Sequence, residues 1–380
     1  MNRIIIIVMD GCGVGAMPDA ASYGPEDAGS ATLPHVAEAV GGLSLPTLTR
    51  LGLGNIAAIQ GVPPEVGAGG WGKLAEASAG KDSVTGHWEM MGIVTETPFP
   101  TCPDGFPPDV IRAFEARIGR PVLGNVAASG TDILNRLGAE HLATGRPIVY
   151  TSADSVFQVA AHEAIVPLET LYEWCAEART LLTAPNNVQR VIARPFVGSP
   201  GGWTRTEHRR DFPLLPPTPN LLTVLQAAGR TAHAIGVVAD LFPRDLFAQA
   251  NRTQSNPAHL AAILDAVQTG QDDLVFANCE DFDMLYGHRN DPAGFARCLE
   301  AFDAGLAEIV RALRPDDLLV ITADHGNDPT TASTDHSREY VPLLTLGGER
   351  LGDLGTGATF AEIARVTAAW LGVEWGGAGN

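Results

Sequence analysis

Three short apolar runs, each followed by an aspartate, constrain the fold of this chain more than any other feature. IIIIVM at residues 4–9 leads directly into Asp10, and LLVITA at 318–323 leads directly into Asp324. LVFANC at 274–279 is followed by the acidic residues Glu280, Asp281 and Asp283. Runs of this length that are rich in Ile and Val and apolar on both faces are typical of buried parallel strands.

Helix-like stretches lie near these runs, at Pro257–Thr269 and Gly294–Leu313. The alternation predicts an α/β protein with a largely parallel sheet between helices. Functional residues of such sheets gather beyond the carboxyl ends of the strands, so the three strand-end carboxylates indicate one site. A last helix is expected near the end of the chain, with Thr359 and Glu362 forming a capping box.

The middle of the chain is bounded by two segments rich in proline and glycine, at 97–109 and 197–219. Such segments are typical of hinges around an inserted domain. We therefore predict a core domain made of residues 1–97 and 213–380. A smaller α/β cap domain is expected at 98–212.

Composition narrows the possible partners. The net charge of −19 disfavours binding to nucleic acid, because an acidic chain repels phosphate backbones. Five scattered cysteines without a CxxC pair predict reduced thiols in a cytoplasmic protein. The first apolar run is too short for a signal peptide and no run approaches a membrane span, so no membrane association is expected. Composition leaves open a monomer or a small homo-oligomer.

Histidines follow two of the strand-end aspartates at short distances along the chain. The predicted ligands are Asp10, Asp283, His288, Asp324, His325 and His336. Carboxylate with imidazole suits Zn²⁺, Mn²⁺ or Fe²⁺. A single strand-end aspartate is more often a turn or cap residue, but the coincidence of three favours a site. Six ligands would divide into two sites of three, an arrangement suited to displacement at phosphorus.

The segment GKDSVTGHWEMMG, residues 80–92, concentrates reactive side chains in what reads as a loop. A dinuclear metal centre can activate a hydroxyl nucleophile, and both Ser83 and Thr85 are candidates. Lys81, His87 and Glu89 are either supporting residues or polar groups of the surface.

Arginine clusters between residues 190 and 210, which hold five of the 25 Lys and Arg residues: Arg190, Arg194, Arg205, Arg209 and Arg210. An acidic chain with such a cluster is equipped to bind an anion through bidentate contacts. A solvated loop is an equally good interpretation for Arg210.

Several segments together resemble the phosphopentomutases of the alkaline phosphatase superfamily: VMDGCGVGAMPDA, GKDSVTGHWEMMG, YTSADSVFQVAAHE, RVIARPFVG, DFDMLYGHRNDP and ADHGNDPTT with TDHSRE. The resemblance runs nearly from end to end. It implies an alkaline-phosphatase-like core with an inserted cap. It also implies two Mn²⁺ ions, with Mg²⁺, Zn²⁺ or Co²⁺ as substitutes, and a sugar bisphosphate activator. The implied reaction interconverts ribose 1-phosphate and ribose 5-phosphate, and the 2-deoxyribose pair.

The resemblance also divides the ligands, with Asp283, His288 and His336 at one metal and Asp10, Asp324 and His325 at the other. Ser83 stands where the family carries the threonine nucleophile of a KDT motif. It is therefore expected to carry the phosphate, with Thr85 as the alternative.

For the substrate, the resemblance places Ser152 and Asp154 at the sugar-binding face of the cap and Arg190 or Arg194 near the distal phosphate. Arg209 of the cluster is a further expected contact. Val237 stands where the family carries a lysine facing the phosphate, and Arg244 is the first candidate to replace that lysine.

Two other functions fit the same motifs. Another phosphomutase or a phosphohydrolase of the superfamily would use the same metals and hydroxyl, and the hydrolase would release free phosphate. A non-catalytic sugar-phosphate-binding module stabilised by metal would bind ligand but never become phosphorylated.

Overall fold

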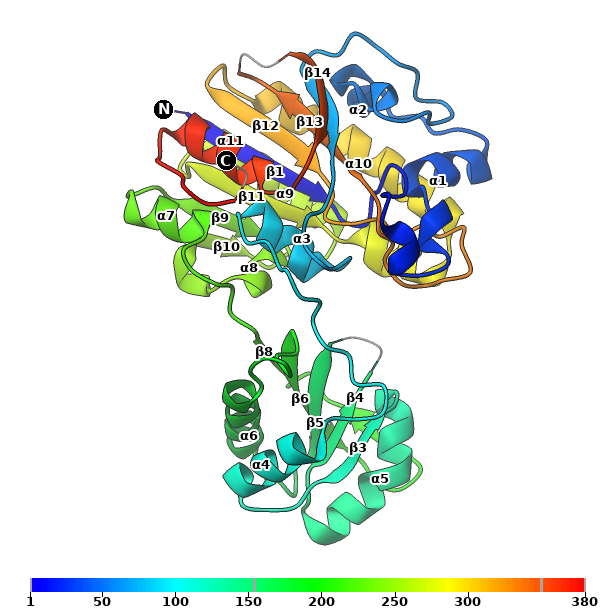
Figure 1. The fold of residues 1–380 in the computed structure, drawn as a ribbon, viewed down its shortest axis with the longest axis vertical. Coiled ribbons are helices and arrows are strands. Elements are labelled where there is room, and N and C mark those ends of the chain that lie inside the picture. The colour runs from blue at the N-terminus through cyan, green and yellow to red at the C-terminus, as the bar shows by residue number, and fades with distance from the viewer. Residues whose placement is uncertain (1, 153–154, 349–350, 379–380) are drawn as a thin grey trace. The chain divides into compact units, whose positions relative to one another are not determined.

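The computed structural model describes residues 2–152, 155–348 and 351–378. The chain forms two compact units (Figure 1). We call Met1–Pro98 with Leu215–Asn380 the core unit and Phe99–Leu214 the inserted unit.

The core unit contains one large sheet, which has eight strands within the described residues, in the order β10-β9-β11-β1-β12-β13-β2-β14. In that order the strands are Gln249–Asn251, Ala232–Ile235, Leu274–Cys279, Arg3–Met9, Asp317–Thr322, Val341–Leu346, Gly70–Leu74 and Gly352–Gly357. The first five strands in this order, β10, β9, β11, β1 and β12, are parallel to one another. β13 runs antiparallel to both of its neighbours, β12 and β2. The predicted α/β class with a largely parallel sheet is confirmed.

The three apolar runs form three adjacent strands at the centre of this sheet. β11 has the predicted bounds, β1 begins one residue earlier at Arg3, and β12 is shifted by one residue to Asp317–Thr322. Every residue of these strands is buried, because helices cover both faces of the sheet.

Helices on one face contact one another and the sheet: α1 (Thr32–Val40), α2 (Pro46–Leu51), α9 (Asn256–Thr269) and α10 (Pro292–Ala312). The other face carries α3 (Ser83–Met90), α7 (Leu221–Ala227), α8 (Val238–Leu241) and α11 (Glu362–Leu371) (Figure 1).

The predicted capping box of the last helix is wrong. α11 begins at Glu362, after Ala361, and has no side-chain cap. The Thr359 hydroxyl instead donates to Glu89 Oε1 at 2.7 Å. The same hydroxyl oxygen accepts from the backbone N–H of Ala361 at 3.1 Å, while the Glu362 N–H donates to the Thr359 backbone oxygen at 3.3 Å. The side-chain contact that defines a capping box is therefore not made.

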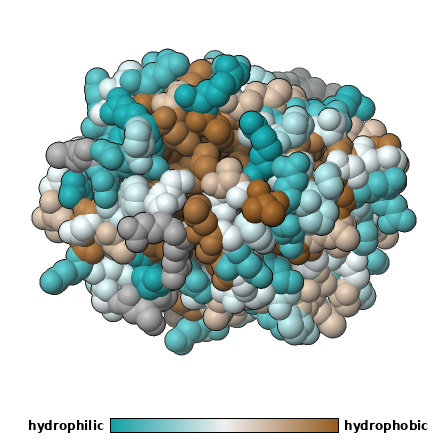
Figure 2. Space-filling view, turned by 90° about the horizontal axis from the view of Figure 1, so that it is seen from above, coloured by the Kyte–Doolittle hydropathy of each residue, from teal (hydrophilic) through white to brown (hydrophobic). Residues whose placement is uncertain are grey.

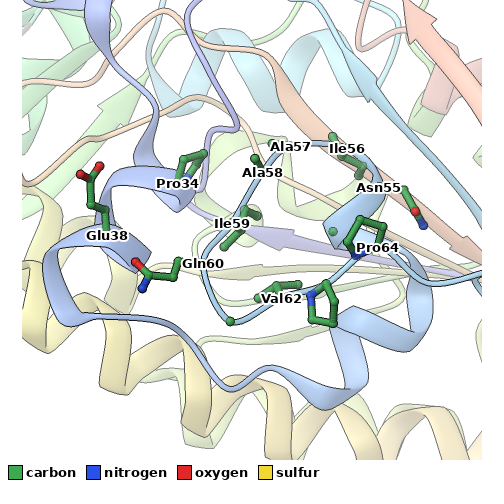
Figure 3. A pocket seen from close by; sticks show the side chains of 13 residues that line it. Pro34, Glu38, Asn55, Ile56, Ala57, Ala58, Ile59, Gln60, Val62 and Pro64 are labelled. Atoms are coloured by element: carbon green, nitrogen blue, oxygen red, sulfur yellow. The ribbon is translucent and has the colours of Figure 1, made fainter.

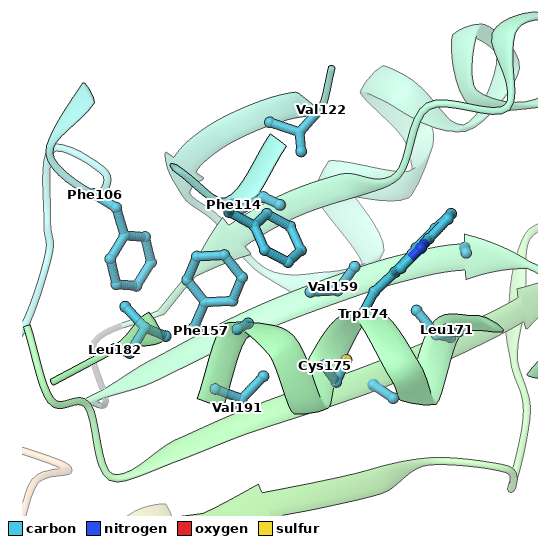
Figure 4. Close-up of a cluster of buried hydrophobic side chains, with 14 of the residues drawn as sticks. Phe106, Phe114, Val122, Phe157, Val159, Leu171, Trp174, Cys175, Leu182 and Val191 are labelled. Atoms are coloured by element: carbon cyan, nitrogen blue, oxygen red, sulfur yellow. The ribbon is translucent and has the colours of Figure 1, made fainter. Parts of the chain in front are cut away.

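The inserted unit has its own sheet and core. Its strands are β3 (Leu123–Ala127), β4 (Ile148–Thr151), β5 (Val156–His162), β6 (Arg190–Val197) and β7 (Thr204–Arg205) in that order, with β8 (Arg210–Pro213) also pairing with β6. Its helices are α4 (Pro108–Ile118), α5 (Gly130–Thr144) and α6 (Leu168–Leu181). A buried cluster around Phe114, Phe157 and Trp174 packs α4 and α6 against β5 and β6 (Figure 4). The unit therefore buries a hydrophobic core without help from the large sheet.

Figure 2 shows a mostly hydrophilic face on which hydrophobic side chains gather in one hollow. Among the described residues, no helix has both the length and the apolar character that a membrane span requires.

Candidate metal centre and nucleophile

The carboxyl ends of three neighbouring strands bring the predicted aspartates together. β11, β1 and β12 are adjacent and parallel. Asp10 directly follows β1 and Asp324 follows β12 closely, while Asp283 lies in a short π-helix, Phe282–Tyr286, after β11. Because parallel strands end at the same edge of a sheet, the three carboxylates reach one place.

Two groups of three candidate ligands form there, and His325 belongs to both. Ligand atoms lie within 4.8 Å of one another in each group, and the groups are Asp10, Asp324 and His325, and Asp283, His325 and His336. His288 Nε2 lies 3.0 Å from Asp283 Oδ2 and so extends the second group. All six predicted ligands therefore lie in one cluster, with His325 shared between its halves.

Buried carboxylate oxygens indicate that the cluster fits metal ions. Among the described residues, Asp10 Oδ1 and Asp324 Oδ2 are buried and accept no hydrogen bond. The other Asp10 oxygen accepts from Asn278 Nδ2 at 2.6 Å, and the other Asp324 oxygen accepts from the backbone N–H of Gly11 at 3.2 Å. An unpaired buried carboxylate oxygen is costly, so each is suited to a cation. Carboxylate and imidazole donors together suit Mn²⁺, Zn²⁺ or Fe²⁺.

The charges of the cluster shift pKa values in a way that favours bound cations. Burial, followed by the charges of Asp324 and Asp283, raises the pKa of Asp10. Burial opposes protonation of His336, but the Asp283 carboxylate outweighs it and raises the pKa of His336 to about 9. Crowded carboxylates therefore stabilise positive charge at this edge of the sheet.

The two candidate hydroxyls differ in what they face. Ser83 is the first residue of α3, and its Oγ lies 3.0 Å from His325 Nε2. Thr85 is fully buried; its Oγ accepts from the Asp82 N–H at 3.4 Å in a capping box and donates to the Asp82 backbone oxygen at 2.9 Å. Burial lowers the pKa of His325, which favours the neutral imidazole that can accept a proton or bind a metal.

The rest of α3 also packs onto the cluster. His87 and Glu89 are fully buried, so the alternative that placed them on the surface is wrong. His87 Nδ1 lies 2.7 Å from the backbone oxygen of Ser83 and 3.4 Å from Asp324 Oδ2. A Cβ on Gly86 would lie 2.4 Å from the backbone oxygen of Asp324, so this close approach requires glycine.

Two asparagines next to the ligands were not predicted. Asn278 in β11 donates to Asp10, and Asn327 Nδ2 donates to Asp283 Oδ1 at 2.6 Å. Both asparagines are fully buried. The available signal was a polar residue inside the apolar run LVFANC and a second one in ADHGND. Each asparagine orients a carboxylate that would bind a metal.

A cavity of about 270 Å³ in the inserted unit brings the arginines together. Its polar lining includes Ser129, Ser152, Gln158, Arg190, Arg194, Arg205 and Arg209. Burial, followed by the charge of Arg209, lowers the pKa of Arg194, as expected where several cations crowd together. The Arg210 guanidinium lies instead 5.1 Å from the ring centres of Tyr172 and Phe212.

The predicted substrate residues Ser152, Arg190, Arg194 and Arg209 thus share one cavity, and Arg205 joins them. Asp154 lies outside the described residues.

A larger cavity, of about 890 Å³, lies in the core unit and shares none of the candidate ligands (Figure 3). It is lined by Pro34, Glu38 and residues 54–64, with Ile56, Ile59 and Val62 among them. These side chains offer little chemistry, so titratable groups and not cavity size identify the candidate site.

Known proteins resemble the chain over almost its whole length. The family model of the metalloenzyme superfamily matches residues 2–375. The phosphopentomutase of Anaeromyxobacter dehalogenans strain 2CP-C is 55% identical over 379 residues, covering 98% of this chain and 95% of the relative. The phosphopentomutase of Caldanaerobacter subterraneus subsp. tengcongensis is 50% identical over 371 residues, covering 97% and 94%.

The PH0037 protein from Pyrococcus horikoshii has a similar fold, with a TM-score of 0.50, 14% identity and coverage of 99% of both chains. That likeness concerns the fold alone. The sequence relatives carry the assignment, because they share half or more of their residues over nearly complete chains. The resemblance is confirmed, and the chain belongs to the phosphopentomutases of the metalloenzyme superfamily.

Proposed function

We propose that this metal-dependent phosphopentomutase interconverts ribose 1-phosphate and ribose 5-phosphate, and the 2-deoxyribose pair, through a phosphoserine at Ser83. The observation that supports this most strongly is the 3.0 Å separation of Ser83 Oγ and His325 Nε2. It brings a hydroxyl to the residue shared by both ligand groups. Thr85 is the weaker candidate, because its hydroxyl is bound by the helix cap.

Two Mn²⁺ ions are the proposed cofactors. Asp10, Asp324 and His325 would hold one, and Asp283, His288 and His336 the other, with His325 also near the second group. Bound ions would lower the pKa of the Ser83 hydroxyl and screen the charge of its phosphate. Mg²⁺, Zn²⁺ or Co²⁺ are possible substitutes because they share these ligand types.

The proposed reaction has two transfers. The phosphate on Ser83 passes to the free hydroxyl of the sugar phosphate, so the Oγ–P bond breaks and a sugar O–P bond forms. The proton of the sugar hydroxyl is returned to Ser83 Oγ. Ser83 Oγ then attacks the other phosphate of the bisphosphate, so a new Oγ–P bond forms while the bond between that phosphorus and its sugar oxygen breaks. The proton of the Ser83 hydroxyl passes to this sugar oxygen, which leaves the isomeric monophosphate and restores the phosphoserine.

The sugar bisphosphate carries two phosphates, and only one of them is transferred in each step. The arginine cavity is the proposed binding site for the other phosphate. Arg190, Arg194 and Arg209 supply charge and paired N–H donors, and Ser152 supplies a hydroxyl. Ser129 caps the N-terminus of α5 beside them, where the helix dipole also favours an anion.

A double-label experiment tests the proposal. Ribose 5-phosphate labelled on phosphorus is mixed with unlabelled phosphate on isotopically heavy ribose, with Mn²⁺ and a priming sugar bisphosphate. Label should appear on the heavy sugar, because the phosphate that leaves Ser83 is not the one that returns. Label confined to its first sugar would exclude the phosphoserine route, and label in free phosphate would indicate a phosphohydrolase. Binding without turnover or phosphorylation would indicate a non-catalytic module.

A further inference from the structure

The backbone before Ser83 is held by an arginine from a distant part of the chain. Arg338 is almost fully buried, although it carries a permanent charge. Its Nη1 donates to the backbone oxygens of Ser78 and Gly80 at 2.7 and 2.6 Å. Its Nη2 donates to the backbone oxygen of Glu76 at 2.8 Å. One guanidinium therefore binds three carbonyls of residues 76–80.

This segment has little regular structure of its own to fix its path. β2 ends at Leu74 and α3 begins at Ser83, with Asp82 as its N-cap. The course of residues 76–80 therefore sets where Asp82 begins the helix. Three of the carbonyls that could otherwise turn toward water are bound by the guanidinium instead, which restricts the segment to one path.

A buried anion binds the same segment through its N–H groups. Glu89 Oε1 accepts from the backbone of Ala77 at 2.9 Å, and Oε2 accepts from the backbone of Ser78 at 2.6 Å. Glu89 belongs to α3, the helix that Ser83 begins. The segment is thus bound by a cation through its carbonyls and by an anion through its amides.

Arg338 is itself tied to the metal-ligand cluster through the backbone. It lies two residues after His336, and its own N–H donates to Asp27 Oδ2 at 3.0 Å. Asp27 also contacts Lys81 Nζ at 3.2 Å, and Lys81 Nζ lies 3.2 Å from Asp335. Two links therefore join the loop that carries His336 to the loop that leads to Ser83.

We infer that Arg338 is a positioning residue that fixes Ser83 relative to His325 and His336 for phosphoryl transfer. The inference rests on the proposed role of Ser83. Residues 76–80, which Arg338 holds, include no member of the candidate ligand groups and no lining residue of the arginine cavity. Its loss should therefore slow the transfer step while leaving metal content and substrate binding in place.

The test compares Arg338→Lys with Arg3→Lys. Arg3 is buried to the same extent and is the first residue of β1, at the end of the strand opposite to Asp10. It donates to the Asp317 carboxylate at 2.8 and 2.6 Å and to the backbone oxygen of Val267 at 2.9 Å. Lysine keeps the charge at either position but cannot bind several carbonyls in one plane. Measurements are kcat and KM for ribose 5-phosphate, Mn²⁺ content, thermal stability, and hydrogen exchange of residues 76–83.

Arg338→Lys should lower kcat by about 100-fold, the cost of a misplaced reacting group, with KM and Mn²⁺ content retained. Exchange of residues 76–83 should become faster. Arg3→Lys should lose thermal stability but keep the kcat and the exchange of that segment. Normal kcat in Arg338→Lys, or a loss matched by Arg3→Lys, would overturn the inference.

A milder variant covers the case in which Arg338→Lys does not fold. Asp19 is partly exposed and accepts from Arg338 Nη2 at 3.0 Å. Asp19→Asn should produce a smaller fall in kcat at constant KM, and unchanged kcat would count against the inference. If the wild-type protein converts no sugar phosphate, the proposed function fails, whereas the exchange comparison still decides whether Arg338 holds the segment.

Discussion

In the core unit the candidate carboxylate ligands are buried where central strands end, whereas in the inserted unit long arginine side chains line a cavity. Asp10 and Asp324 are almost fully buried, and their positions follow from the backbone of β1 and β12. Arg190 and Arg209 are partly exposed, and the carboxylate of Asp211 pairs with Arg209 at 2.6 Å. The buried carboxylates have little freedom to change position. The partly exposed arginine side chains can change conformation to fit a ligand.

This difference predicts different kinetic effects. Changes at the strand ends should act on turnover, because they disturb atoms that must be placed to within fractions of an ångström. Changes in the arginine cavity should act on binding, because any of several cations can approach the anion. The predictions below test this division, from the largest expected effect to the smallest.

Removing the proposed nucleophile should abolish turnover. Ser83→Ala should lower kcat by about 10⁴-fold or more, because no other hydroxyl lies at His325 within the described residues. Mass spectrometry of the intact protein should find no covalent phosphate, while Mn²⁺ content stays normal. Ser83→Thr should retain substantial activity and phosphorylation. An active Ser83→Ala together with an inactive Thr85→Ala would transfer the role to Thr85.

Removing a ligand should lower metal content and turnover together. His336→Ala should lose bound Mn²⁺ and at least about 100-fold in kcat, because it removes one of the proposed ligands beside Asp283. The matched control is His208→Ala in the inserted unit, whose histidine lies 2.8 Å from Glu163 and should affect neither quantity. A chelator should inactivate the wild type and Mn²⁺ should restore it. Full metal occupancy and normal turnover in His336→Ala would remove His336 from the ligand set.

The central strands were predictable because a strand that is buried on both faces appears in the sequence as a nearly continuous apolar run. The runs that became β1, β11 and β12 are apolar except for Asn278 and Thr322, and a carboxylate follows each strand within two residues. Parallel direction then follows from the strand–helix alternation, and it brings Asp10, Asp283 and Asp324 to one edge.

Other features depend on distances between residues that are far apart in the sequence, which a local sequence pattern does not predict. His325 lies in both ligand groups because of how two loops fold over the sheet, which spacing along the chain does not describe. The Thr359 hydroxyl can both donate and accept, and only the folded positions of its neighbours show that it donates to Glu89 and accepts from the Ala361 N–H. Arg209 and Arg210 are neighbours of the same type, yet one lines the cavity and the other lies over aromatic rings.

Removing one cavity arginine should weaken binding and spare turnover. Arg194 lies in the cavity with its Nε bonded to Gln158 Oε1 at 3.0 Å, and within the described part of the chain its terminal nitrogens form no other hydrogen bond, so they can contact an anion. Arg194→Ala should raise the KM for ribose 5-phosphate about 10- to 100-fold, the value of a charge-assisted hydrogen bond of about 1.5–3 kcal/mol. The control is Arg210→Ala, whose KM should stay normal. A fall in kcat without a change in KM would break the proposed division between the units.

The smallest effect concerns Val237, the N-cap residue of α8, which lies beyond the carboxyl end of β9 in the core unit. Its φ of −65° is compatible with any side chain, so Val237→Lys adds a cation without backbone strain. We expect the added cation to lower the KM for ribose 5-phosphate. The neighbouring Gly236 lies so close to Glu280 that a Cβ on it would be 3.0 Å from Glu280 Oε2. That carboxylate should attract the new ammonium and limit the fall in KM to a few-fold.

Combining Val237→Lys with Glu280→Gln tests this competition. The double variant should show a larger fall in KM, measured against Glu280→Gln alone, because the ammonium loses its internal partner. Val66→Lys is the control for added charge, since Val66 is 99% exposed in the core unit and should leave KM unchanged. An unchanged KM in both lysine variants at position 237 would mean that another cation already contacts the phosphate. Arg244 is the first candidate, although its Nη1 donates to the backbone oxygen of Phe247 at 2.5 Å and would have to leave that bond.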